Sequence, residues 1–116
     1  MSSKRKLNTI KRHAHLFAAL GDQTRLSLVS KLSDGQPRSI TQLADDHDLT
    51  RQAITKHLHV LENAGIVRSF RTGRESIFEF DAKPLNDLQN YLARVSDQWD
   101  DALARLKSFV EDEELD

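Results

Sequence analysis

Polar and cationic side chains recur along residues 51 to 64 at the spacing of one face of a helix. When this segment is projected at about 100° per residue, its polar side holds Gln52, Lys56, His59 and Asn63, with Arg51 and Thr55 at the borders. The opposite side holds Ile54, Leu58 and Leu61. Amide, hydroxyl and cationic groups can read base edges and hold phosphates in a DNA major groove, which is about 12 Å wide. The segment is therefore a candidate recognition helix.

A polar outer face is not sufficient by itself, since every amphipathic helix has one. The residues that follow predict two strands, 66–71 and 76–81, and the turn between them contains the glycine that a hairpin favours, Gly73. This hairpin carries Arg68, Arg71 and Arg74, which can reach an adjacent stretch of DNA backbone or the minor groove. Residues 49 to 76 hold five Lys/Arg and two Asp/Glu, a net charge of +3 that favours a polyanion as partner.

Capping residues place the candidate recognition helix within a helix-turn-helix. Ser39 and Gln42 match a capping box at the start of a short helix over about 40 to 47. Thr50 can cap the next helix, which ends at Gly65, and two helices joined by a turn of about three residues form a helix-turn-helix. A further helix upstream can be capped by Asp22, with an apolar stripe of Leu26, Val29 and Leu32.

Longer helices are predicted at both ends of the chain. The apolar positions of the first, which stops near Gly21, are Leu7, Ile10, Ala14, Phe17 and Leu20. The last opens at Pro84, and its apolar positions advance by three and four: Leu85, Leu88, Leu92, Val95, Trp99, Ala102, Leu106 and Phe109. We expect a mobile basic arm over residues 1–6, one domain over 7–110 and an acidic tail that frays over 111–116. The expected fold is mainly α with a two-stranded β-wing, a winged helix-turn-helix.

Composition excludes several other classes of protein. A chain of 116 residues is expected to form a single core, and its lack of cysteine excludes disulfides, thiolate nucleophiles and cysteine-based metal sites. No glycine-rich phosphate loop and no convergent set of Ser, His and acid is apparent, so an enzyme is not expected. No apolar run is long enough for a membrane span or a signal peptide, and we expect a cytoplasmic protein. Residues 1–76 carry 13 Lys/Arg and 7 Asp/Glu (+6), whereas 77–116 carry 4 and 11 (−7).

The strings LFAALGDQTRLSLVSKL and DLTRQAITKHLHVLENAGIVRSFRTGRESIFEFD resemble the ArsR-type winged helix-turn-helix repressors, over residues from about 14 to 110. The resemblance implies a prokaryotic homodimer that occludes promoters, with an interface built by the first and last helices. It implies that the groove is faced by Thr50, Gln52, Thr55, Lys56 and His59, with Arg71 and Arg74 on the wing. His57 projects toward the buried side and is expected to be structural.

Many proteins of this family release DNA on binding a metal, but the known ligand sets are missing here. By resemblance, Ser39 and Thr41 stand where thiolate sensors carry a Cys-x-Cys pair, and no histidine follows His59. Asp97, Asp100 and Asp101 cluster on the last helix and are interpreted as a solvated face, because carboxylates alone favour hard cations. We therefore expect no metal and no cofactor. A small molecule in the dimer interface or a partner protein stays open as the controlling signal.

Pairing of two chains is expected because the last helix has more apolar surface than so small a core can cover, and each such side chain gains about 1.5–3 kcal/mol on burial. The expected interface contains Leu7, Ile10, Ala14, Phe17, Leu88, Leu92, Val95, Trp99, Ala102 and Leu106. A two-fold axis would set two recognition helices about 34 Å apart, which predicts a palindromic operator. The alternative is a winged protein-interaction module that has lost DNA binding. The polar outer face of 51–63 disfavours this alternative, since docking helices expose apolar surface.

Overall fold

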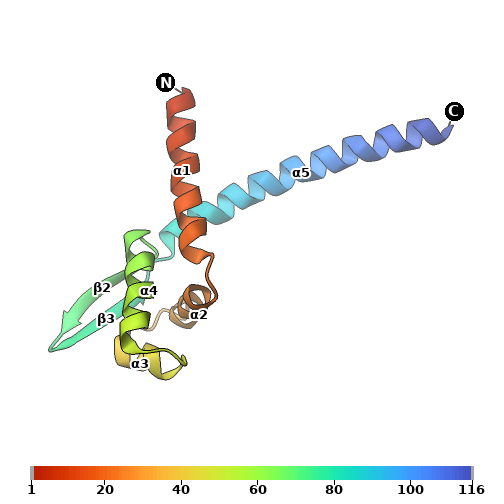
Figure 1. The fold of residues 1–116 in the computed structure, drawn as a ribbon. Helices are drawn as coiled ribbons and strands as arrows, with labels where there is room; N and C mark the ends of the chain where they lie inside the picture. The colour runs from red at the N-terminus through yellow and green to blue at the C-terminus, as the bar shows by residue number, and fades with distance from the viewer. Residues whose placement is uncertain (1, 116) are drawn as a thin grey trace. The chain divides into compact units, whose positions relative to one another are not determined.

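The computed structural model describes residues 2–115, and it describes their side chains over residues 3–112. The elements are α1 (Ser2–Leu20), α2 (Gln23–Leu32), β1 (Arg38–Ser39), α3 (Ile40–Asp45), α4 (Arg51–Asn63), β2 (Val67–Thr72), β3 (Glu75–Phe80) and α5 (Lys83–Leu115) (Figure 1). The predicted mainly helical fold with a β-wing is confirmed. Contacts divide the chain into two compact units, one ending at Leu85 and one beginning at Asn86, and the described part of the second lies entirely within α5. No helix in the described part of the chain is long and apolar enough to cross a membrane.

The helix starts follow the predicted capping chemistry. The Asp22 carboxylate accepts a hydrogen bond from the Arg25 amide at the start of α2. Ser39 and Gln42 form both bonds of the capping box at α3, and the Thr50 hydroxyl accepts from the Ala53 amide at α4. Each cap satisfies a backbone N–H that has no partner within its own helix, which sets where the helix begins.

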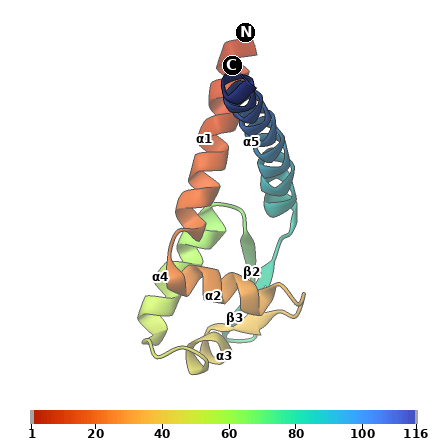
Figure 2. The same ribbon diagram turned by 90° about the vertical axis from the view of Figure 1, so that its right-hand side faces the viewer.

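The wing is a three-stranded antiparallel sheet in the order β1-β3-β2. The hairpin of β2 and β3 turns at Gly73, whose φ of 62° lies in the left-handed region that glycine adopts without strain. Strand β1 pairs Arg38 with Phe78 and Ser39 with Ile77 and was not predicted. Two residues are too few to show the alternation that identifies a strand in sequence. Helix α3 lies beside β3 (Figure 2), so the sheet links the β2–β3 hairpin to the helix-turn-helix.

The core of the winged unit joins the inner faces of its helices to the base of the wing. Its fully buried side chains are Leu28, Leu32, Leu43, Ile54, Leu58, Leu61, Ile66 and Val67. The predicted stripe of α2 was wrong at one position, since Leu26 is 51% exposed and Leu28 is buried instead. Either leucine fits the helical spacing of an apolar stripe that includes Val29 and Leu32. Arg25 lies on the packed side of α2, where its guanidinium reaches backbone carbonyls of α1, so the inward face is centred nearer Leu28.

Helix α1 begins earlier than predicted. It runs from Ser2, so residues 2–6, which were expected to form an arm, are helical, while Met1 lies outside the described residues. Serine, lysine and arginine in this segment tolerate a helix well, and a helix that has nucleated downstream can propagate through them. Helix α5 likewise continues to Leu115 through most of the expected acidic tail, and Asp116 is outside the described residues. Apolar periodicity, the signal used for the prediction, cannot locate such polar helix ends.

We predict that this fold loses stability in acid, because three of its carboxyl groups have a lowered pKa. Hydrogen bonds from Arg38 and from the Gln36 amide lower the pKa of Asp34 from 3.8 to about 2. A hydrogen bond from the Arg25 amide lowers the pKa of Asp22. A hydrogen bond from Lys31 lowers the pKa of Asp46. A carboxylate with a depressed folded pKa stabilises the fold above its unfolded pKa, and that stability disappears as the pH falls through the folded pKa. The melting temperature should therefore drop between about pH 4 and pH 2. Asp34→Asn should show a smaller drop over this range; an equal drop would contradict the assignment.

Candidate nucleic-acid interface

Helix α4 separates its two faces as the sequence predicts. Ile54, Leu58 and Leu61 are fully buried and hold the helix against the core. The expected contact residues Arg51, Gln52, Lys56 and His59 are exposed, together with the capping residue Thr50. Because burial fixes one face, the opposite face is presented as a rigid polar surface. We call the exposed residues 50–59 of this face, with Thr55, the recognition surface.

Thr55 is half-buried at the border of this surface, and its hydroxyl is already engaged. The Oγ1 atom donates to the carbonyl of Arg51 at 2.7 Å, one turn earlier in the helix. A hydroxyl has one proton, so Thr55 can meet DNA only as an acceptor or through its methyl group. Gln52 has no such local bond among the described residues, and its amide is free to donate and accept.

A polar anchor holds the inner side of α4 to the first two helices. The Arg25 guanidinium donates from Nε to the carbonyl of Ala19 at 2.6 Å, and its Nη1 lies 3.1 Å from His57 Nδ1. Because a guanidinium has only donors, the His57 nitrogen is the acceptor. His57 Nδ1 also lies 3.7 Å from the carboxylate of Asp22, the cap of α2. These contacts agree with the structural role expected of His57.

The three wing arginines differ in their surroundings. Arg68 donates from Nε to Glu79 at 2.8 Å and lies 4.0 Å from Asp81, so its charge is balanced by carboxylates. Arg71 and Arg74 are exposed and make no ion pair within the described part of the chain. Side chains alternate along a strand, so Arg71 shares a face of β2 with Ser69, which bonds Glu62 of α4. Arg71 therefore lies on the side of the wing that carries the recognition helix.

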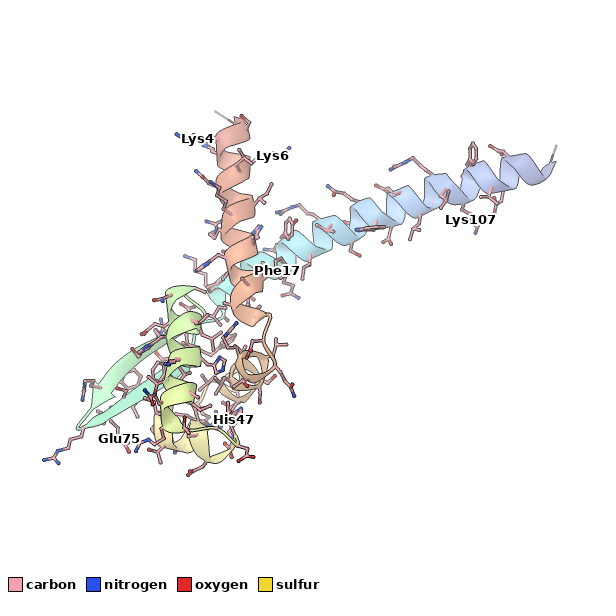
Figure 3. The ribbon with its side chains drawn as sticks, viewed as in Figure 1. Lys4, Lys6, Phe17, His47, Glu75 and Lys107 are labelled. Atoms are coloured by element: carbon pink, nitrogen blue, oxygen red, sulfur yellow. The ribbon has the colours of Figure 1, made fainter. Side chains whose placement is uncertain are left out.

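The expected interface residues of α1 form an exposed apolar stripe, with Leu7 58%, Ile10 52% and Phe17 40% exposed and Ala14 exposed beside them. The buried side of this helix carries His13, Leu16 and Ala19. Phe17 is labelled on α1 in Figure 3.

On α5, Leu92, Trp99 and Leu106 are 48%, 64% and 59% exposed, Ala102 is exposed and Val95 is half-buried. Leu88 differs from the expectation, because only 3% of it is exposed within the single chain. A side chain already covered cannot add apolar area to an interface with another molecule.

The acidic residues of α5 remain exposed, as expected of a solvated face. Among the residues that the structure describes, no group of three or more His, Cys, Asp or Glu side chains is arranged to hold a metal ion. His13 is buried and His15 is exposed, so the two imidazoles of α1 lie in different environments. The metal-free interpretation stays a prediction.

Comparisons with known proteins agree with this geometry. Residues 22–69, which span α2 to the first half of β2, match the family model described as bacterial regulatory protein, arsR family. The HTH-type transcriptional regulator YuzN of Bacillus subtilis (strain 168) is 40% identical over 79 residues, covering 63% of this chain and 86% of that protein.

Solved structures extend the similarity to the fold. An ArsR-like transcriptional regulator from Rhodococcus sp. RHA1 is 36% identical with a TM-score of 0.75, covering 88% of this chain and 95% of the other. The winged domain of Mb0332 from Mycobacterium bovis, described as homodimeric, is 21% identical with a TM-score of 0.65 over 81% of this chain and 86% of its own, which shows a shared fold. The capped helix-turn-helix, the wing with its exposed arginines and these matches together show that the chain belongs to the ArsR family of transcriptional regulators, with a DNA-binding winged helix-turn-helix fold.

Proposed function

We propose that this protein is a homodimeric repressor that binds an inverted-repeat operator in double-stranded DNA. The observation that carries the proposal is the recognition surface, a rigid polar and cationic face whose reverse side is fully buried. The proposed DNA contacts are Thr50, Arg51, Gln52, Thr55, Lys56, His59, Arg68, Arg71 and Arg74. Among the wing residues, Arg71 and Arg74 are the stronger candidates, since no carboxylate balances their charge within the described residues.

Dimerisation is supported by the exposed apolar stripes of α1 and α5. Large contiguous apolar surface is uncommon on monomeric soluble proteins and typically marks an interface. In a two-fold dimer the same patch of each chain meets its copy, and two recognition helices then reach half-sites about 34 Å apart. The homodimeric description of Mb0332 concerns that protein, and it agrees with this arrangement. Residues 7–110 are proposed as the unit that binds DNA and pairs, acting in the cytoplasm without a metal or cofactor.

Selection of genomic fragments by the purified protein, followed by footprinting, tests the proposal directly. We expect enrichment of fragments that contain an inverted repeat, with protection of two half-sites one helical turn apart. A half-site overlapping a promoter would agree with repression, since a bound dimer would exclude polymerase. No enrichment at low salt would overturn DNA binding and favour a protein-interaction module.

Two substitutions on the recognition surface should have different consequences. Lys56→Ala should weaken binding to all sequences and reduce the slope of log K against log [salt] by about one unit per protomer, because a phosphate contact carries no sequence information. Gln52→Ala should instead relax the base preference at one operator position, by about 1–3 kcal/mol, because its amide would read a base edge.

Binding isotherms on operator and single-mismatch duplexes at several salt concentrations measure both effects. Lys4→Ala provides a matched change of charge, since Lys4 lies at the outer end of α1, away from α4 (Figure 3). Identical behaviour of the Lys56 and Gln52 variants would contradict the division of roles between phosphate and base.

A further inference from the structure

A polar cleft of about 180 Å³ opens between the helix-turn-helix and the wing. Its polar lining comes from three separate segments: Ser39 and Thr41 at α3, Arg51 at the start of α4, and Arg74, Glu75 and Ser76 at the tip of the wing. Glu75 is labelled at this tip in Figure 3. The cleft is thus continuous with the recognition surface through Arg51 and with the wing through Arg74. These segments lie far apart in the sequence, and the pairing of β1 with β3 brings them together.

Two guanidinium groups in the cleft lack partners within the described part of the chain. Three other arginines of the winged unit are engaged: Arg25 with Ala19 and His57, Arg38 with Asp34, and Arg68 with Glu79. Arg51 and Arg74 have no hydrogen bond or ion pair through their side chains among the described residues, and both are exposed. Two unpaired cations facing one small cleft create a local excess of positive charge that Glu75 offsets only in part.

The donors of the cleft suit an oxyanion. A guanidinium presents parallel N–H groups that match the oxygens of a phosphate, and it has no acceptor that could bind a metal. The hydroxyls of Thr41 and Ser76 make no hydrogen bond among the described residues and can donate, whereas the Ser39 hydroxyl already accepts from the Gln42 amide as a cap. A phosphate group and several waters fit within the volume.

We propose that this cleft binds one phosphate group, held jointly by Arg51 and Arg74 with the hydroxyls of Thr41 and Ser76. The inference rests on the proposed DNA binding, because in the complex the group is a phosphodiester of the DNA backbone. A single phosphate held from both sides would fix the angle between the recognition helix and the wing, so the two elements would meet the duplex as one rigid surface.

Joint binding makes a sharp prediction about salt dependence. Each phosphate neutralised on a duplex contributes about 0.9 to the slope of log K against log [salt]. If Arg51 and Arg74 share one phosphate, the double variant Arg51→Gln, Arg74→Gln should lower the slope by about one unit per protomer. The matched pair Arg51→Gln, Arg71→Gln also removes two charges, but Arg71 does not line the cleft. Because the shared phosphate needs both guanidinium groups, this pair should lose two separate phosphate contacts, and the slope should fall by about two units.

Fluorescence anisotropy with the whole chain and a mixed-sequence duplex measures these slopes without knowledge of the operator, and the melting temperature of each variant checks the fold. A fall of about two units for the Arg51 and Arg74 pair, equal to that of the matched pair, would overturn the shared site while leaving DNA binding intact. Glu75→Gln should tighten binding, because it removes the carboxylate that opposes the phosphate.

Inorganic phosphate distinguishes a backbone phosphodiester from a free anion as the ligand. Titration of the DNA-free protein should shift the amide resonances of Thr41, Arg51 and Ser76, and the double variant of Arg51 and Arg74 should abolish the shifts. Such shifts in a protein that shows no salt-dependent DNA binding would support the phosphate site, with a free anion as its ligand, and overturn the proposed function. An absence of both responses would overturn both proposals.

Discussion

Trp99→Glu should convert the protein into a monomer and lower its affinity for the operator by at least about 100-fold. Trp99 is 64% exposed on the apolar stripe of α5, so the substitution leaves the core of the single chain intact. In a dimer the same position would bury a carboxylate without a partner, which costs several kcal/mol. A monomer also loses the second half-site, and linked sites typically contribute a factor of about 10² to 10⁴ in affinity.

Sedimentation velocity and operator binding measure the two effects on the same samples. Ala104→Glu is the matched control, because residue 104 is exposed on the opposite side of α5, about 140° from residue 99 in a helical projection. We expect this control to remain dimeric. A Trp99→Glu variant that stays dimeric, or a monomeric variant that binds the operator with unchanged affinity, would contradict the proposed interface.

Leu58→Ala should destabilise the fold by about 2–5 kcal/mol, the range for deleting a buried leucine side chain. Leu58 is fully buried on the inner face of α4. A small domain has only about 5–15 kcal/mol of total stability, so this one substitution removes a large share of it. Loss of packing at Leu58 should also let the recognition surface move, because the buried face of α4 holds the exposed face in position.

Urea unfolding at a fixed protein concentration measures the change, because the stability of a dimer depends on concentration. Val60→Ala is the matched control on the same helix, where the side chain is 39% exposed. Its effect should lie within about 0.5 kcal/mol, as for most surface substitutions. Equal losses for the two variants would show that α4 does not pack as described.

The sequence predicted those parts of the fold that depend on a single capping residue or on the helical spacing of apolar residues within one segment. Asp22, Ser39 and Thr50 cap the helices predicted for them, since a cap is a local hydrogen bond between a side chain and an amide three residues away. The inner face of α4 was predicted for a similar reason: helical geometry fixes which residues share a side.

The errors have a common origin in packing between elements. Leu26 and Leu28 both fit an apolar stripe of α2, and the position of Arg25 against α1 selects Leu28. Strand β1 exists because β3 offers it a partner. Spacing along one segment contains no information about which neighbour covers it.

The order of residues was thus enough to determine the helix-turn-helix, the hairpin and the chemical character of the recognition surface, because these depend on contacts within a few positions of the chain. The three-dimensional arrangement alone determined that Glu79 balances Arg68, that Arg51 and Arg74 face one cleft, and that Arg25 ties the recognition helix to the first two helices. Those relationships join residues far apart in sequence, and they arise only when the core brings their elements together.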